Sequence, residues 1–316
     1  MYILLALDPV HIGTGGYRLG RVDNTIVREP GTNLPKIPAT SLCGPLRSFM
    51  ALRNDKFPQC AGQGQAPEGN ENAGIFAHCG KYDCPVCVGF GFSHSRNSFQ
   101  GMIQLSDAHL LFYPVYSRLG PIWVTSPSVL MAALMNLGVI TEKNSQEEIF
   151  VDEGTIKSTV EMKLKGGAKL NLGWLLLQVD EMSFSLPEKF KSCIPKYIAN
   201  KMVLVSDKLF PLIVNDNLEV RTSVSINPVT GAAKEGALFT YEAIPRATVM
   251  QCVVTINDPS FYRIPPDGQE PSIKKEDLNK KLYEAAEYMQ WLGIGGMNTR
   301  GMGRMRVISP CYGGEE

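Results

Sequence analysis

An alternating pattern of apolar residues opens the chain. Ile3, Leu5 and Leu7 fall on one side of an extended segment and Leu4 on the other, which predicts a strand buried on at least one face. Shorter runs predict further strands at residues 102–105, 110–115, 121–125, 174–179, 218–226, 250–256 and 304–308. Many short strands therefore form the framework of the expected fold.

Helical spacing of apolar residues marks three other segments. One stripe runs through residues 42–50 and follows Thr40 or Ser41, either of which could cap the helix. Residues 126–137 predict a second helix. The clearest pattern starts at Leu278, from which apolar residues recur at i+4, i+7, i+11 and i+14.

Strands and helices alternate irregularly, and turns separate several strands. Lysines and glycines at 163–169 predict the tip of a hairpin, and residues 227–231 have the composition of a turn. This arrangement favours an α+β fold with a largely antiparallel sheet over a doubly wound parallel one. The segment 8–38 predicts a long ordered loop, and residues 58–100 predict an insertion on the core.

Composition narrows the functional classes. The 316 residues carry 31 basic and 31 acidic side chains. The zero net charge excludes a protein that coats nucleic acid through its overall positive charge, but it does not exclude a local basic groove. No stretch reaches about 18 uninterrupted apolar residues, and Asp8 and Pro9 end the first apolar run too early for a signal peptide. We expect a cytoplasmic protein that does not contact a membrane.

Four of the eight cysteines cluster in the 58–100 insertion. Cys84 and Cys87 form a CxxC knuckle, Cys79 lies five residues before it, and Cys60 lies nineteen residues further back. Thiolates at this spacing predict a structural Zn²⁺ site that would stabilise a polar insertion without a core of its own. His78 and His94 are alternatives to Cys60 as the fourth ligand, and a redox CxxC is the main competing interpretation.

Two glycine-rich segments do not fit nucleotide-binding motifs. In the first, at 13–16, the third Rossmann glycine would fall on Arg18. The second, 293–303, lies between a helix and a strand, which is the reverse of the Rossmann order, and no P-loop is present. It carries Arg300 without a nearby acid, and residues 8–56 have a local charge of +4. These loops indicate a groove for a polyanion, or else a helix end followed by a tight turn.

Several segments carry a resemblance to a known family. Residues 11–15 (HIGTG), 20–24 (GRVDN), 26–30 (IVREP) and 34–38 (LPKIP) resemble the opening of the RAMP proteins of type III CRISPR effectors. Residues 114–117 (PVYS), 123–127 (WVTSP) and 236–245 (GALFTYEAIP) narrow the resemblance to the repeated backbone subunit of the type III-B (Cmr) complex. The glycines of 293–303 resemble the glycine-rich loop of the superfamily.

The resemblance implies a ferredoxin-like, RRM-related core across a single RAMP domain, residues 1–316, with a β-hairpin thumb. We expect the thumb and a helical insertion within approximately 141–217. Copies of such a subunit stack head-to-tail along a CRISPR RNA, together with the other Cmr subunits. Each thumb displaces one nucleotide of the guide–target duplex, and the target RNA is cut at six-nucleotide intervals.

Carried onto this sequence, the resemblance implies that Asp23 cleaves the target RNA, and we expect it to depend on Mg²⁺. Asp23 would otherwise be a turn residue paired with Arg21 or Arg28. In this chain Cys43 stands where the family usually has a lysine in the first helix. The contact of that lysine with the guide phosphate is therefore expected to pass to Arg47 or to be lost. The expected RNA contacts are His11, Arg21, Arg28, Arg47, Tyr241, Glu242, Gly295, Gly296, Arg300, Gly301 and Gly303.

Two other functions stay open at this point. One is a structural RNA-binding backbone subunit of a type III complex without catalysis, including a type III-A-like or divergent variant. The other is a metabolic enzyme that contains zinc or an iron–sulfur cluster, for which the sequence shows no cofactor fingerprint.

Overall fold

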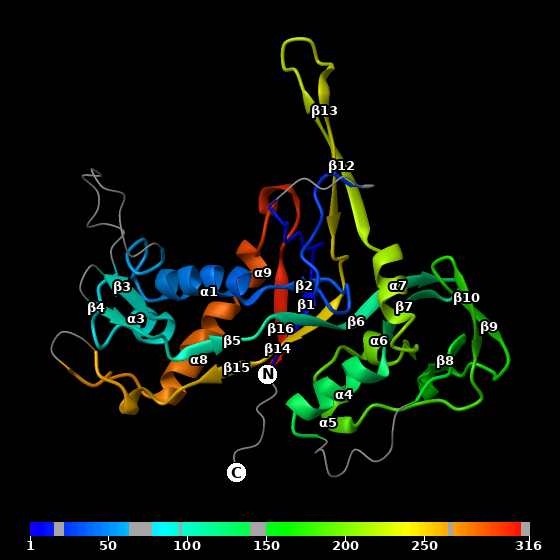
Figure 1. Ribbon diagram of the computed structural model, residues 1–316, viewed down its shortest axis with the longest axis horizontal. Helices are drawn as coiled ribbons and strands as arrows, with labels where there is room; N and C mark the ends of the chain where they lie inside the picture. Colours follow the sequence, from blue (N-terminus) through cyan, green and yellow to red (C-terminus); the bar gives the residue numbers. More distant parts are fainter. Residues whose placement is uncertain (16–21, 63–77, 95–96, 140–149, 265–267, 311–316) are drawn as a thin grey trace. The chain divides into compact units, whose positions relative to one another are not determined.

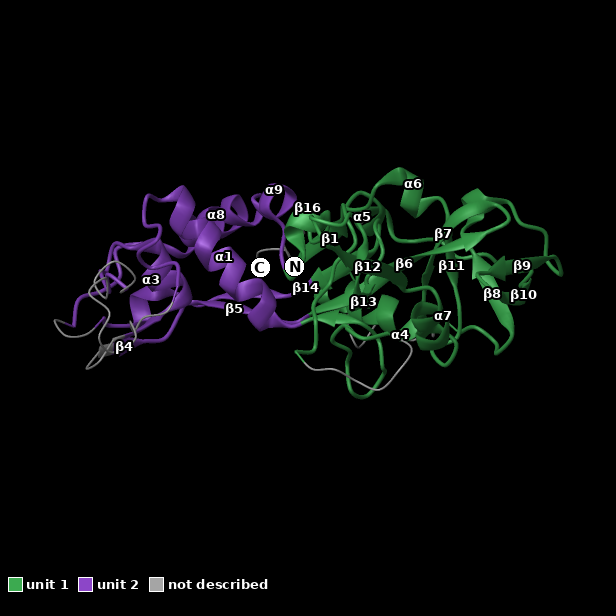
Figure 2. Ribbon diagram, turned by 90° about the horizontal axis from the view of Figure 1, so that it is seen from above, with its two compact units in different colours: residues 1–37, 108–251, 295–316 green, residues 38–107, 252–294 purple. Residues whose placement is uncertain are grey.

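The computed structural model describes residues 1–15, 22–62, 78–94, 97–139, 150–264 and 268–310. The chain divides into two compact units (Figure 2). Unit 1 is built from residues 1–37, 108–251 and 295–316, and unit 2 from residues 38–107 and 252–294. Three separate stretches of sequence thus meet in unit 1, and two meet in unit 2.

A long sheet forms the framework of unit 1. Its strands, in the order in which they pair, are β16 (Met305–Pro310), β1 (Tyr2–Ala6), β14 (Val249–Cys252), β6 (Ala108–Ser117), β7 (Gly120–Thr125), β11 (Met202–Leu204), β8 (Thr155–Ser158), β10 (Leu175–Val179) and β9 (Lys169–Leu172). The short strand β2 (Lys36–Ile37) also pairs with β6. All five residues of β1 are buried, as its apolar sequence predicts.

The predicted hairpin tip at 163–169 is wrong. Residues 160–162 form a 3-10 turn that ends at Lys163, whose left-handed φ of 49° interrupts the alternating run. β9 pairs instead with β10 across a turn that contains Gly173, and β10 continues in parallel to β8. Leu170 and Leu172 of β9 are buried.

Helices and apolar side chains complete the core of unit 1. The helices are α4 (Pro127–Asn136), α5 (Glu188–Lys191), α6 (Lys196–Ala199) and α7 (Phe210–Asp216). Phe112 from the sheet packs against Phe190 of α5, with ring centroids 5.9 Å apart, in a cluster that includes Leu130 and Leu134 of α4. This packing accounts for the predicted helix at 126–137.

A two-stranded hairpin projects from the rest of unit 1 (Figure 1). It consists of β12 (Glu219–Ile226) and β13 (Ala233–Ala243), which pair in antiparallel register. The turn predicted at 227–231 connects them, and the Gly231 N–H donates to the Asn227 carbonyl at 2.8 Å. The hairpin starts directly after the region 141–217.

Unit 2 is built around two packed helices, α1 (Ala39–Arg53) and α8 (Lys275–Ala286). Its other elements are α3 (Pro85–Phe90), α9 (Met289–Leu292), β3 (Phe92–His94), β4 (Asn97–Phe99), β5 (Ile103–Leu105) and β15 (Val254–Ile256). Helix α1 begins after Pro38, so neither Thr40 nor Ser41 is its cap. The strand predicted at 250–256 is divided at Val253, whose N–H donates to the Ser106 hydroxyl.

The predicted α+β class is confirmed, because antiparallel strand pairs dominate and helices pack against them. Among the pairs of the described strands, β11–β7 and β10–β8 are parallel. Over the same residues, no helix combines the length and apolar character needed to cross a bilayer.

Candidate functional sites

Asp23 is held on the hairpin strand β13 by Thr240. Its Oδ2 accepts hydrogen bonds from the Thr240 backbone N–H at 2.7 Å and from the Thr240 hydroxyl at 2.9 Å. The Asp23 N–H donates back to the Thr240 hydroxyl at 3.1 Å. Asp23 is exposed, and these donors, with the backbone N–H first, hold the pKa of its carboxyl below the usual value.

The backbone on the C-terminal side of Asp23 is fixed to the same strand. The Asn24 N–H donates to the Thr240 carbonyl at 3.0 Å, and the Glu242 N–H donates to the Asn24 carbonyl at 3.0 Å. Asn24 and Tyr241 thereby form a parallel β-bridge. A strand edge, rather than a free loop, therefore positions the carboxylate of Asp23.

Arg28 and Glu242 form an ion pair inside unit 1. The Arg28 Nη2 lies 2.8 Å from Glu242 Oε2, and the two side chains are 20% and 14% exposed. The same guanidinium donates to Asn215 Oδ1 and to the Ile26 carbonyl. Arg28 therefore pairs with Glu242 and not with Asp23, while Arg21, the other expected partner of Asp23, lies outside the described residues.

His11 and Tyr241 are both buried beside this network. The His11 Nδ1 lies 2.6 Å from the Glu242 carbonyl, which requires the proton on that nitrogen, and its ring meets Tyr241 edge-on. Tyr241, one of the expected RNA contacts, is only 4% exposed, so its ring offers little surface on which a base could stack in this conformation. Its hydroxyl accepts a hydrogen bond from Ser223 at 3.3 Å.

The glycine-rich loop packs on the segment that carries His11. The Gly296 N–H donates to the His11 carbonyl at 3.0 Å, and the Gly303 N–H donates to the Pro9 carbonyl at 2.8 Å. Gly301 donates to Asn298, which is within the loop. These three amides are bonded within the chain, so they do not form an open phosphate cradle in this conformation.

Gly295 allows the glycine-rich loop to approach the backbone of His11 closely. It has a φ of +75°, and a side-chain Cβ there would lie 2.6 Å from the His11 carbonyl oxygen and 2.5 Å from Ile12 Cδ1. The cation of this loop, Arg300, is exposed and lies 5.9 Å from the ring centroid of Phe239. Arg300 is therefore an exposed cation of this loop.

The structure thus brings Asp23, Tyr241 and Glu242 together with His11 and the glycine-rich loop in unit 1. Thr240, which makes three hydrogen bonds with Asp23, was not among the residues expected from the sequence. Thr240 lies within the family-like segment 236–245, but nothing in the spacing of that segment distinguishes it from its neighbours. Thr240 contacts Asp23 only because two segments that are distant in the sequence pair in the fold and bring residue 23 beside residue 240.

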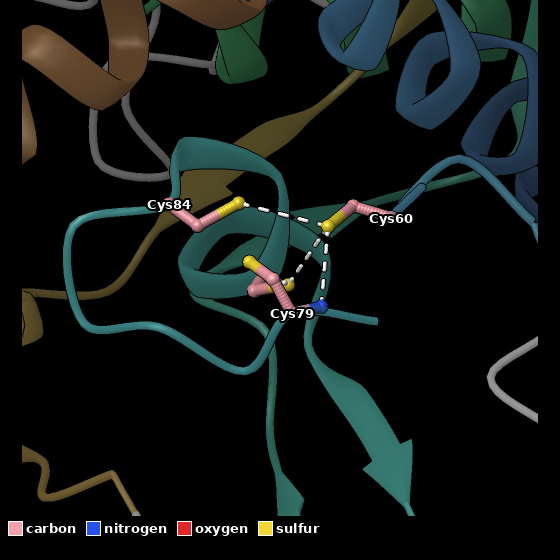
Figure 3. Close-up of side chains that lie close together, drawn as sticks. Cys60, Cys79 and Cys84 are labelled. Atoms are coloured by element: carbon pink, nitrogen blue, oxygen red, sulfur yellow. Dashed lines mark hydrogen bonds between the residues drawn. The ribbon is translucent and has the colours of Figure 1, made fainter. Parts of the chain in front are cut away.

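The four clustered cysteines meet in unit 2 (Figure 3). Sulfur–sulfur distances are 3.6 Å for Cys60 and Cys87, 3.7 Å for Cys79 and Cys87, and 3.9 Å for Cys60 and Cys84. Tetrahedral coordination with metal–sulfur bonds of about 2.3 Å requires thiolates roughly 3.8 Å apart. The cluster therefore has the dimensions for one metal ion, and it is too tight to enclose a cluster of several irons.

Cys60 completes this set in place of a histidine. Its sulfur lies with the other three, all within 4.8 Å of one another, whereas the His78 Nε2 donates to the Gly62 carbonyl at 2.8 Å. The side chain of His94 lies outside the described residues. Hydrogen bonds among the four thiols, with those of Cys60 first, lower the pKa of Cys79 and raise the pKa of Cys84 and Cys87.

Arg47 lies at this cysteine cluster. Its Nε donates to the Cys60 carbonyl at 2.6 Å, and its Nη1 donates to the Phe90 carbonyl at 3.4 Å. These donors are used within unit 2, so they are not available to a guide phosphate in this conformation.

Comparison with known proteins agrees with the sequence motifs. The sequence profile of the RAMP superfamily matches residues 3–306. This chain belongs to the RAMP superfamily. The resemblance to RAMP proteins found in its sequence is thus confirmed.

Two curated RAMP relatives carry names that describe a function. The CRISPR system Cmr endoribonuclease Cmr4 of Pyrococcus furiosus is 27% identical over 311 residues, which are 96% of this chain and 93% of the relative. The CRISPR system Cms endoribonuclease Csm3 of Methanothermobacter thermautotrophicus is 32% identical over 100 residues, 31% of this chain and 34% of the relative. The similarity to the Cmr protein therefore spans nearly the whole chain.

Solved structures of RAMP proteins share the fold. A chain of the type III-B Cmr-beta complex in its apo state matches with a TM-score of 0.65 and 15% identity, over 98% of this chain and 97% of that chain. Oligomeric Cmr4 from Pyrococcus furiosus matches with a TM-score of 0.57 and 21% identity, over 97% of each chain. The architecture described above is therefore that of the Cmr backbone fold.

Proposed function

We propose that this RAMP protein is the backbone subunit of a type III-B CRISPR complex. It binds the guide RNA and cleaves the complementary target RNA at six-nucleotide intervals. The observation that carries the proposal is the exposed, ionised carboxylate of Asp23, fixed by Thr240 at the base of a projecting hairpin. The similarity to a Cmr endoribonuclease over 96% of the chain supports it.

The hairpin β12–β13 fits the expected thumb. It projects from unit 1 (Figure 1), and it starts at Glu219, just beyond the region 141–217 that we assigned to the thumb from the sequence. Val229 at its turn is 90% exposed, and Leu238 along β13 is 66% exposed. Apolar side chains at such positions can enter a base stack, so this hairpin would displace one nucleotide close to Asp23.

The chemistry needs no protein nucleophile, because the 2′-hydroxyl beside a displaced nucleotide can attack the adjacent phosphorus when the backbone is held in line. The lowered pKa of Asp23 makes it a poor proton acceptor and a good ligand for a cation. A hydrated Mg²⁺, when bound, would neutralise charge at the scissile phosphate. Asp23 would hold that ion through its carboxylate, and Arg300 would hold the RNA backbone.

The partners follow from the same proposal. Guide and target RNA contact unit 1, further copies of the chain extend the assembly head-to-tail, and other Cmr subunits complete it.

The four cysteines hold a structural Zn²⁺, because their spacing fits a single tetrahedral ion and three of them are buried. Metal analysis of the purified chain should find about one zinc per polypeptide.

The test is cleavage of a complementary RNA by the reconstituted complex. Asp23→Asn should abolish the six-nucleotide ladder and preserve target binding, and Mg²⁺ removal should have the same effect on the wild type. Glu153→Gln is the matched control, because Glu153 is an exposed acid of unit 1 that forms an ion pair with Lys208. If Asp23→Asn cuts at the wild-type rate, the subunit is a structural RNA-binding protein and catalysis belongs elsewhere in the complex.

A further inference from the structure

The guanidinium of Arg47 links the two arms of the cysteine cluster. One arm is the segment that supplies Cys60, and the other is helix α3, which has Cys84 at its start and Cys87 in its first turn. Arg47 donates to the carbonyl of Cys60 itself and, from a second nitrogen, to the carbonyl of Phe90. Phe90 is the last residue of α3, where helix carbonyls lack partners within the helix.

The link made by Arg47 connects two segments that the chain itself does not hold together. Twenty-three residues separate Cys60 from Cys84 along the chain, so no local backbone geometry fixes the distance between them. Arg47 projects from α1, a 15-residue helix that contacts α3 and α8. The side chain therefore ties both arms of the cluster to a helix that does not supply a ligand.

The positive charge of Arg47 also suits a site formed by four thiolates. Four thiolates around a divalent ion carry a net charge of −2, and a partly buried negative group is costly unless a cation lies near it. The Arg47 Nη2 is itself buried without a hydrogen-bond partner, and within the described part of the chain no carboxylate lies within ion-pair distance of Arg47. The charged thiolates supply the compensation that this cation otherwise lacks.

We infer that Arg47 is a positioning residue of the metal site: it fixes Cys60 relative to α3 and offsets the charge of the thiolates. Residues that orient metal ligands typically change metal affinity about 10–100-fold when they are replaced. This role is independent of RNA cleavage, and it replaces the guide contact that we expected for Arg47 from the sequence.

The test uses the full-length chain with Co²⁺, whose thiolate absorption reports occupancy, in competition with a chelator. Arg47→Met should weaken metal binding about 10–100-fold. Arg53→Met is the matched control, because Arg53 lies on the same helix and pairs with Glu284 at the surface, and it should bind as the wild type does. Equal affinities of the Arg47→Met and Arg53→Met variants would overturn the inference.

A second variant separates the two roles of Arg47 and remains usable if Arg47→Met fails to fold. Arg47→Lys keeps the positive charge but loses the planar fork that reaches two carbonyls. It should bind Co²⁺ several-fold more weakly than the wild type, and its cysteines should react faster with an alkylating reagent in the metal-loaded protein. Wild-type affinity and wild-type alkylation rates in this variant would show that Arg47 does not position the site.

Discussion

Asp23 and Thr240, which are 217 residues apart in the chain, exchange three hydrogen bonds: two are accepted by Asp23 Oδ2 and one is donated by the Asp23 N–H. All three involve one edge of the carboxylate and the adjoining backbone. Both of the hydrogen bonds that Thr240 donates to the carboxylate go to Oδ2. Thr240 thus fixes the position of one oxygen, Oδ2, of the Asp23 carboxylate.

Replacing the Thr240 hydroxyl should reduce cleavage without reducing RNA binding. Thr240→Val keeps the shape and the backbone donor but removes the hydroxyl, so Asp23 gains rotational freedom and its pKa rises towards the ordinary value. We expect a rate about 5-fold lower, because the loss of the hydroxyl's hydrogen bond to Asp23 Oδ2, worth about 1 kcal/mol, has roughly that effect. Single-turnover cleavage by the reconstituted complex measures the rate.

Thr240→Ser is the control for this prediction, because it retains the hydroxyl and should cleave near the wild-type rate. Cleavage by Thr240→Val that equals that of the wild type would remove Thr240 from the positioning of Asp23. Equal losses of binding and cleavage would make it a folding residue instead.

Acid should destabilise the protein only at low pH. The Arg304 hydrogen bond lowers the pKa of Asp8, and Thr240 lowers that of Asp23, so both carboxylates are more acidic in the folded than in the unfolded chain. Such groups stabilise the fold above their unfolded pKa, near 4, and this stabilisation is lost as the pH falls through the lower folded pKa.

The melting temperature should therefore show no loss due to these groups between pH 8 and 5, and a decline below about pH 4. In Asp8→Asn the same decline should be shallower, because one of the two linked protonations is gone. A decline of identical steepness in wild type and variant, measured by circular dichroism, would contradict the assignment to Asp8.

Adding one methyl group should have different effects on stability at two adjacent glycines of the loop, Gly295 and Gly296. Gly295→Ala places a Cβ 2.6 Å from the His11 carbonyl oxygen at a positive φ, which should cost about 1–3 kcal/mol of unfolding free energy. In Gly296→Ala the new Cβ would lie 3.5 Å from His11 Cδ2, an ordinary contact distance, and the unfolding free energy should change by no more than about 0.5 kcal/mol. Urea unfolding of both variants measures the difference, and equal stabilities would contradict the close packing of Gly295 on His11.

The sequence predicted elements that depend on local pattern and missed those that depend on pairing. The buried strand β1 and the grouping of the four cysteines follow from periodicity and spacing, and the structure has them. The helix pattern from Leu278 is also present, but it is divided into α8 and α9. The hairpin at 163–169 failed because Lys163 takes a left-handed conformation that alternation does not reveal. Arg28 and Arg47 were predicted as RNA contacts from their charge, and the sequence did not reveal their partners within the chain: Glu242 lies 214 residues from Arg28, and Cys60 offers its carbonyl rather than its thiol to Arg47.

Two arginines of unit 1 should differ in how they affect RNA binding. Arg28 is paired with Glu242 in a partly buried site, whereas Arg300 is exposed. Arg28→Met leaves Glu242 without its cation and should lower the unfolding free energy by about 2 kcal/mol, between the values for surface and buried pairs. Arg300→Met should leave stability nearly unchanged but remove a phosphate contact.

The salt dependence of RNA affinity tests this difference. A lost phosphate contact reduces the slope of log affinity against log salt by about 1, because one fewer counterion is released. We expect this reduction for Arg300→Met and no change of slope for Arg28→Met, with binding of the assembled complex measured between about 50 and 200 mM salt. A reduced slope for Arg28→Met with unchanged stability would show that the ion pair with Glu242 opens in the complex and that Arg28 contacts the RNA directly.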